Sequence, residues 1–184
     1  MNRLQPYRER GATLLIALIL LLVITVLAIS SIREAALEER IVGNVRDQQA
    51  AFNGAESALR EAETRLANSA GPPLPATPCA ATLCVLPSPP TSISFLDWSW
   101  WQSNAITYQG ATTDSTALGV ASTPRWQSAF IGFDPADSNG TVEVTDPDLR
   151  SKGVGPYYYQ VNAASQGRST RTMTSLQSVT VQRY

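Results

Sequence analysis

Histidine is absent from this chain of 184 residues, and cysteine occurs only twice. Without histidine there can be no Ser-His-Asp triad, no Cys-His pair and no His-ligated zinc or haem site. Two cysteines are too few for a structural zinc site and allow at most one disulfide within the chain. A basic excess is also missing, since 14 Lys and Arg stand against 15 Asp and Glu, and this argues against a nucleic-acid binder. We therefore expect a protein that is not an enzyme and binds neither a metal, another cofactor nor nucleic acid.

Charge is missing altogether from residues 11 to 32. At helical rise the apolar run 12–32 spans roughly 31 Å, close to the ~30 Å hydrocarbon thickness of a bilayer. A core helix of a soluble domain is rarely apolar on every face for so long. The run therefore predicts a transmembrane segment. Because arginines outnumber acids in residues 1–10, we expect the N-terminus in the cytoplasm and the rest of the chain outside it.

Small residues precede the apolar run, whereas an ordinary secretory signal has a shorter apolar region followed by its small-residue cleavage site. The stretch 8–15, RERGATLL, resembles the processing site of type IV prepilins. That resemblance implies removal of a leader, residues 1–11, by a membrane aspartyl peptidase that cuts between Gly11 and Ala12, and N-methylation of Ala12. Alanine departs from the phenylalanine or methionine more usual at the first mature position. A simple uncleaved signal anchor is the alternative interpretation.

The helical pattern continues beyond the apolar run, because no proline occurs between residues 12 and 68. A helix over that range would be roughly 85 Å long. Apolar residues, several of them seven apart, predict a stripe that packs against a folded head. The stripe consists of Ile41, Val45, Phe52, Ala55, Leu59, Ala62 and Leu66.

The polar side of this helix carries two charge pairs at i,i+4 in the favourable order. They are Glu56 with Arg60 and Glu61 with Arg65. Two glycines, Gly43 and Gly54, also lie in the helical pattern, each costing up to ~1 kcal/mol against alanine. They mark either bends or places of close approach, and the sequence leaves both interpretations open.

The stretch 39–60 resembles the N-terminal region of PilX-type minor pilins. Pilins have a long spine helix, and the N-terminal halves of these helices bundle in the core of the fibre. By resemblance, residues 12–32 are the transmembrane and assembly half of the helix, residues 33–70 its amphipathic half, and residues 71–184 a periplasmic head.

Most pilins carry a glutamate as the fifth residue after the cut, where it neutralises the terminal amine of a neighbouring subunit. Here the fifth residue is Ile16, and the apolar run offers no other carboxylate. A charge in an apolar bundle is costly unless paired. A subunit at the head of the fibre has no older neighbour and needs no such carboxylate, so we expect a tip position. The alternative is that its loss merely lowers the efficiency of incorporation.

The head is expected to open with a loop, because seven prolines lie between residues 71 and 90. In an oxidising periplasm Cys79 and Cys84 can form a disulfide, which we favour over a metal or redox site because the spacing is not C-x-x-C. The aromatic cluster of Trp98, Trp100 and Trp101 follows. We expect it mainly in the core, with an exposed interface platform as the alternative.

Alternating and aromatic runs predict strands in the rest of the head. They cover residues 126–133, 141–144, 157–161 and 170–183, whereas 104–123 is typical of a loop or an irregular strand. About four antiparallel strands packed on the helix give an α+β, pilin-like fold.

An acidic turn follows the first of these strands. Its oxygen-bearing residues are Asp134, Asp137, Asn139, Glu143, Asp146 and Asp148. Such residues can bind calcium, but the spacing does not match an EF-hand. We favour a solvated hairpin turn.

These features predict a minor pilin that primes type IV pilus assembly at or near the tip and supports biogenesis, twitching motility and attachment. Expected partners are other minor pilins, the major pilin, the prepilin peptidase and methylase, the inner-membrane assembly machinery, a tip adhesin, and membrane lipid before assembly. We expect the chain in the bacterial inner membrane and then in the extracellular pilus. The alternatives are a tip pseudopilin of type II secretion, a signal-anchored periplasmic adhesin or binding protein, and a signal-anchored enzyme, although the chain shows no nucleophile motif.

Overall fold

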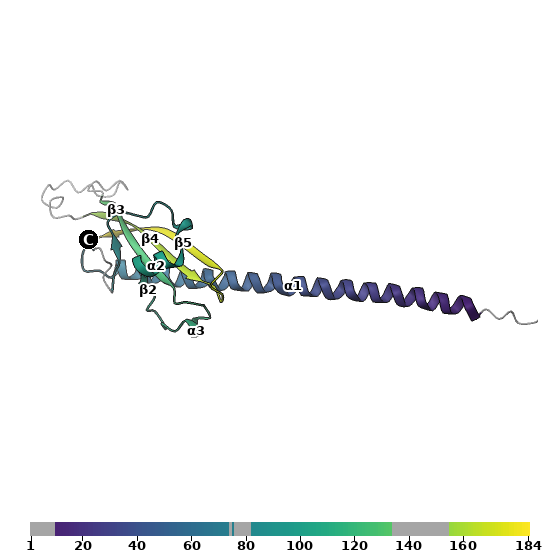
Figure 1. Cartoon of the computed structure of the whole chain (residues 1–184). Helices are drawn as coiled ribbons and strands as arrows, with labels where there is room; N and C mark the ends of the chain where they lie inside the picture. The colour runs from purple at the N-terminus through teal and green to yellow at the C-terminus, as the bar shows by residue number, and fades with distance from the viewer. Residues whose placement is uncertain (1–9, 74, 76–81, 134–154) are drawn as a thin grey trace, which may run out of the picture. The chain divides into compact units, whose positions relative to one another are not determined.

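The structure is a computed structural model that describes residues 10–73, 75, 82–133 and 155–184. The chain divides into two compact units, Met1–Val45 and Arg46–Tyr184. Helix α1, Arg10–Ala67, contributes to both units (Figure 1). Its bounds lie within two residues of those predicted from the absence of proline.

The apolar part of α1 in the first unit is uncovered. Its large apolar side chains from Leu14 to Ile32 are all exposed, between 45% at Val23 and 72% at Leu14. The hydroxyls of Thr25 and Ser31 donate to helix carbonyls within the preceding turn, at 2.8 and 3.1 Å, so they need no partner outside the helix. Among the described residues, α1 is the one helix long and apolar enough to cross a membrane.

The second unit contains a five-stranded sheet. Its strands are β1 Val85–Leu86, β2 Ile106–Thr107, β3 Arg125–Phe133, β4 Pro156–Gln166 and β5 Met173–Arg183. The order is β1-β3-β4-β5, and β2 also pairs with β3. All pairings are antiparallel except that of β1 with β3, which is parallel. The predicted α+β, pilin-like fold is confirmed, with a mixed sheet that is mainly antiparallel.

Three of the predicted strands correspond to β3, β4 and β5, and the fourth, residues 141–144, lies outside the described residues. Strand β1 lies in a stretch predicted to be a loop, and β2 lies in the stretch 104–123 predicted to be a loop or an irregular strand. Each has two residues, and each is held by β3: the carbonyl of Cys84, just before β1, accepts hydrogen bonds from Ser128 N and Oγ at 2.8 and 2.6 Å. Pairing of this kind depends on tertiary context, which explains why the local sequence does not reveal it.

The core of the head forms where small residues of α1 meet the sheet. The completely buried positions on α1 are Ala51, Ala55, Ala58, Ala62 and Leu66. Their spacing of three or four residues keeps them on one face of a helix with 3.6 residues per turn. From the sheet, Trp126, Tyr159 and Val161 are also completely buried, and they belong to the same cluster as Ala58, Ala62 and Leu66.

The stripe predicted for α1 is wrong in part. Ala55, Ala62 and Leu66 face the core and Leu59 is half-buried, but Phe52 is 46% exposed, and the first-unit residues Ile41 and Val45 are also exposed. The sheet packs on the face with the smallest side chains, because alanine lets the sheet come close to the helix. The predicted stripe followed the larger side chains, and these lie to one side of that face.

The described part of the head also contains a 3-10 helix, η1 Ile93–Phe95, and two short α-helices. Helix α2, Trp98–Asn104, begins at Asp97, whose carboxylate accepts a hydrogen bond from Trp100 N at 3.0 Å. Helix α3, Ser115–Leu118, ends at Gly119 in the left-handed conformation, φ 68°, which glycine adopts without strain. Trp101 is completely buried, whereas Trp98 and Trp100 are half-buried around it.

Gly54 is a place of close approach. A Cβ atom there would lie 3.0 Å from Ser165 Cβ and 3.2 Å from Pro124 Cγ, and closer still to Ser165 Oγ. Ser165 is completely buried and its hydroxyl donates to Gln166 O at 2.9 Å, so it has little room to move. A Cβ at Gly43 would meet nothing within 4 Å.

We predict opposite effects for alanine at these two glycines. Gly54→Ala should lower the free energy of unfolding of the head by ~1–2 kcal/mol, because overpacking outweighs the gain in helix propensity. Gly43→Ala, the matched control, should leave the stability unchanged or raise it by up to ~1 kcal/mol. Denaturant unfolding in detergent, followed by tryptophan fluorescence, measures both. Equal effects of the two variants would contradict the close approach at Gly54.

Candidate functional site

The described part of the first unit presents an exposed apolar surface. Ile16 lies in this surface with 55% of its side chain exposed, and no acidic residue occurs between Ala12 and Arg33. Beyond the charge-free run, Leu37, Ile41 and Val45 are exposed as well. A continuous exposed apolar surface of this kind marks contact with lipid or with other proteins.

Asp47 connects the start of the second unit's helix to the β4–β5 turn. Its two carboxylate oxygens accept hydrogen bonds from Ser169 N at 3.0 Å and Ser169 Oγ at 2.8 Å. Donation by the Thr172 side chain, by Ser169 and by the backbone of Arg168 lowers the pKa of Asp47 from 3.8 to about 2, because each of these donors favours the charged carboxylate. Gly167 allows the turn to approach, since a Cβ there would lie 2.6 Å from Asp47 O.

Further along α1, a second group of polar contacts holds the head. Glu61 and Arg65 form the predicted i,i+4 ion pair at 2.6 Å, and the other predicted pair, Glu56 with Arg60, is also present. Arg65 Nη1 donates to Thr82 O at 2.6 Å, and Glu61 Oε2 accepts from Gln109 N at 2.8 Å. These two side chains therefore connect the helix to the loops that flank the short strands β1 and β2.

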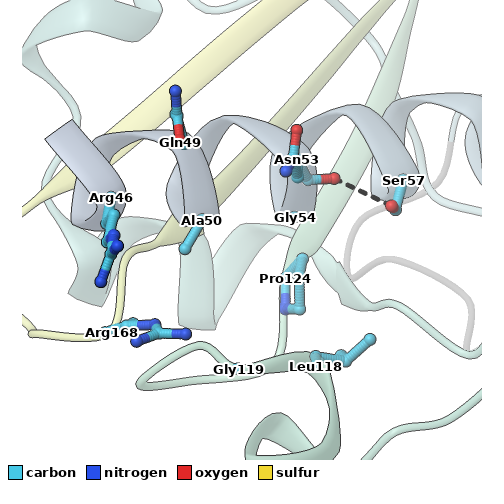
Figure 2. A pocket seen from close by; sticks show the side chains of 10 residues that line it. All are labelled: Arg46, Gln49, Ala50, Asn53, Gly54, Ser57, Leu118, Gly119, Pro124 and Arg168. Atoms are coloured by element: carbon cyan, nitrogen blue, oxygen red, sulfur yellow. Dashed lines mark hydrogen bonds between the residues drawn. The ribbon is translucent and has the colours of Figure 1, made fainter.

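A pocket of about 330 Å³ opens beside Asp47, between α1, the segment around α3 and the β4–β5 turn (Figure 2). Arg46 from α1 and Arg168 from the turn place their guanidinium groups on the same side of it. Pro124 and Leu118 lie further along its wall. We refer to it as the two-arginine pocket.

The remaining predicted site residues are spread over the head. Cys84 is completely buried in the core, but its expected partner Cys79 lies outside the described residues, so the disulfide stays a prediction. The acidic turn, residues 134–148, also lies outside them. In the parts of the chain that the structure describes, no three His, Cys, Asp or Glu side chains gather as metal ligands would.

The grouping of Asp47, Arg46 and Arg168 was not predicted from the sequence. Asp47 and Ser169 are 122 positions apart in the chain, and only the fold brings them together. The sequence offers a weak signal for the turn, a glycine followed by polar residues between two strands. Nothing in it indicates which part of the helix the turn contacts.

A long helix with an exposed apolar N-terminal part, followed by a mainly antiparallel sheet packed on its C-terminal part, defines the pilin-like class of proteins. Residues 10–60 match the sequence model of the family described as PilX N-terminal. This region of the chain is therefore similar to the N-terminal region of PilX-type minor pilins. The match covers less than a third of the chain and none of the sheet. No curated protein and no solved structure matches the chain.

The Asp47 contacts predict a pH dependence of stability. The carboxylate has a lower pKa in the folded chain than in the unfolded one, so its contribution is complete above pH ~4 and is lost as the pH falls through about 2. Asp47→Asn should lower the free energy of unfolding by ~1 kcal/mol at pH 6, since the side chain is partly exposed. The difference in the free energy of unfolding between the unchanged chain and the Asp47→Asn variant should shrink as the pH falls from 4 to 2. Denaturant unfolding across this pH range measures it, and a constant difference would contradict the assignment.

Proposed function

We propose that this chain is a minor pilin that primes the assembly of type IV pili and occupies the tip of the fibre or a position close to it. The observation that carries the proposal is the uncovered, charge-free surface of α1, which follows directly on Arg10 and Gly11 inside the region that matches PilX. Such a surface can be covered first by lipid and then by the apolar helices of other subunits.

In this proposal the leader, residues 1–11, is removed between Gly11 and Ala12, and Ala12 is methylated. Residues 12–32 then anchor the chain in the bacterial inner membrane, residues 33–70 contain the rest of the helix, which ends at Ala67, and the head, residues 71–184, stands in the periplasm. The arginines before the apolar run support this orientation, because positively charged flanks stay in the cytoplasm. Pulling the helix out of the membrane is feasible only if neighbouring helices replace the lipid around it.

Part of the predicted stripe fits contact between subunits better than contact within one. Val45 and Phe52 are seven residues apart on α1, and both are exposed, as is Ile41. A spacing of seven is what parallel helices use when they pack side chains against one another. We assign these three residues to the surface that meets the helices of other pilins.

The tip position follows from Ile16. Without a carboxylate in its apolar run, the subunit cannot neutralise the terminal amine of an older subunit, and at the tip no older subunit exists. Priming by this subunit with other minor pilins would precede addition of the major pilin. Twitching motility and attachment, with a tip adhesin as a further partner, would then be properties of the assembled fibre.

Mass spectrometry of purified fibres tests the proposal. We expect the chain to be present, to begin at Ala12 and to carry an N-terminal methyl group. Gly11→Val should block cleavage, because a branched side chain at the scissile position obstructs the peptidase, and should remove the chain from the fibres. Full-length chain in membranes with none in fibres would overturn the proposal. Recovery from a type II secretion complex would indicate a pseudopilin.

Ile16→Glu tests the tip position separately. The new carboxylate can pair with the amine of a neighbour, so the variant should enter the shaft, and immunogold labelling should move from fibre ends to positions along the fibre. Ile16→Gln, which has the same size without the charge, is the matched control and should stay at the ends. Unchanged fibre number and labelling with Ile16→Glu would contradict the tip position.

A further inference from the structure

We propose that the two-arginine pocket binds a carboxylate-bearing helical segment of the neighbouring pilin in the fibre. The inference rests on the proposed function and adds a contact surface on the head. The pocket lies beside the Asp47 contacts, and Arg46 and Arg168 come to it from different elements, α1 and the β4–β5 turn. The fold thus places two positive charges on one side of a single pocket (Figure 2).

Asp47, which follows Arg46 in the chain, is already engaged. Both oxygens of Asp47 accept hydrogen bonds from Ser169, which holds the carboxylate on the turn. Among the described residues, the ion pairs are Glu56–Arg60 and Glu61–Arg65, and neither includes Arg46 or Arg168. Two like charges that share a pocket repel each other, and a carboxylate from outside would relieve that repulsion through charge-assisted hydrogen bonds.

The rest of the pocket indicates the kind of ligand. Asn53 and Ser57 line it, and the hydroxyl of Ser57 donates to Asn53 O at 2.8 Å. Pro124 and Leu118 give it an apolar wall away from the arginines. A volume of about 330 Å³ is large for a lone carboxylate group and suits an acidic side chain together with a small apolar neighbour.

The chain itself shows what such a segment looks like. Residues 34–39, EAALEE, carry Glu34, Glu38 and Glu39, all exposed, with alanines and a leucine between them. This segment and Arg46 both lie within residues 10–60, the region that matches PilX. One N-terminal region therefore carries both the acidic residues 34–39 and the basic residue Arg46 on its helix. Charge complementarity therefore favours a pilin helix of this kind as the occupant.

A lipid phosphate fits less well. Fourteen residues separate Ile32, the end of the apolar run, from Arg46, which is roughly 21 Å at helical rise. The headgroup region extends only ~5–8 Å beyond the hydrocarbon on each side of a bilayer. An arginine that far from the apolar run can reach a protein partner more readily than a lipid headgroup.

Photo-crosslinking in assembled fibres tests the inference. A benzoylphenylalanine in place of Gln49, at the edge of the pocket, should attach to a pilin peptide with an Asp or Glu within one helical turn of the attachment point. Adducts with phospholipid, with peptides lacking an acid, or no adducts from chains present in fibres would overturn the inference and leave the proposed function intact. Absence of the unmodified chain from fibres would overturn both.

Charge reversal makes the test specific. Arg46→Glu with Arg168→Glu should lower the crosslink yield about tenfold. Arg171→Glu is the matched control, because Arg171 is exposed in the same β4–β5 turn but does not line the pocket, and its yield should stay unchanged. Changing the crosslinked partner acid to Arg should restore the yield of the double variant. The inference would be overturned if the crosslink yield fell equally in the control and the double variant. It would also be overturned if the change of the partner acid to Arg failed to restore the yield.

Discussion

The close contact between the alanine face of α1 and the sheet is the constraint on which the head depends. Ala55, Ala58 and Ala62 are completely buried, and Gly54 beside them has no space for a Cβ. Small side chains let the sheet approach the helix, and the larger Trp126 and Tyr159 then fill the core from the sheet side. A bulky residue on this face of the helix would separate the two layers and leave cavities around both aromatic rings.

Polar contacts fix where along the helix the sheet sits. Apolar packing alone tolerates sliding, because several alanines present nearly the same surface. Asp47 holds the β4–β5 turn, and Glu61 and Arg65 hold the loops near β1 and β2, so the sheet is tied to the helix at both ends. The pair at 61 and 65 also contacts the core, since the Arg65 guanidinium lies 5.7 Å from the centre of the Trp126 ring.

The sequence allows the fold class and the helix bounds to be predicted, because proline, charge and apolar periodicity act locally. It misleads about the buried face of α1. A stripe through Val45 and Phe52 is as amphipathic as the alanine face, and only the sheet decides between them. Helix α2 was not predicted, although its N-terminal cap Asp97 is a local signal, whereas the Asp47 contacts required knowledge of the fold. The contacts between helix α1 and the head therefore cannot be predicted from local sequence, because tertiary packing determines them.

The same choice of face explains how one helix can serve two kinds of packing. Because the head buries four alanines and Leu66 from α1, the large apolar residue Phe52 is left for other contacts. Phe52 is exposed although it adjoins the buried Ala51, so the face buried within the subunit and an exposed apolar face lie next to each other on one turn. Separate faces let the head fold completely while an apolar surface of the helix stays exposed for other contacts.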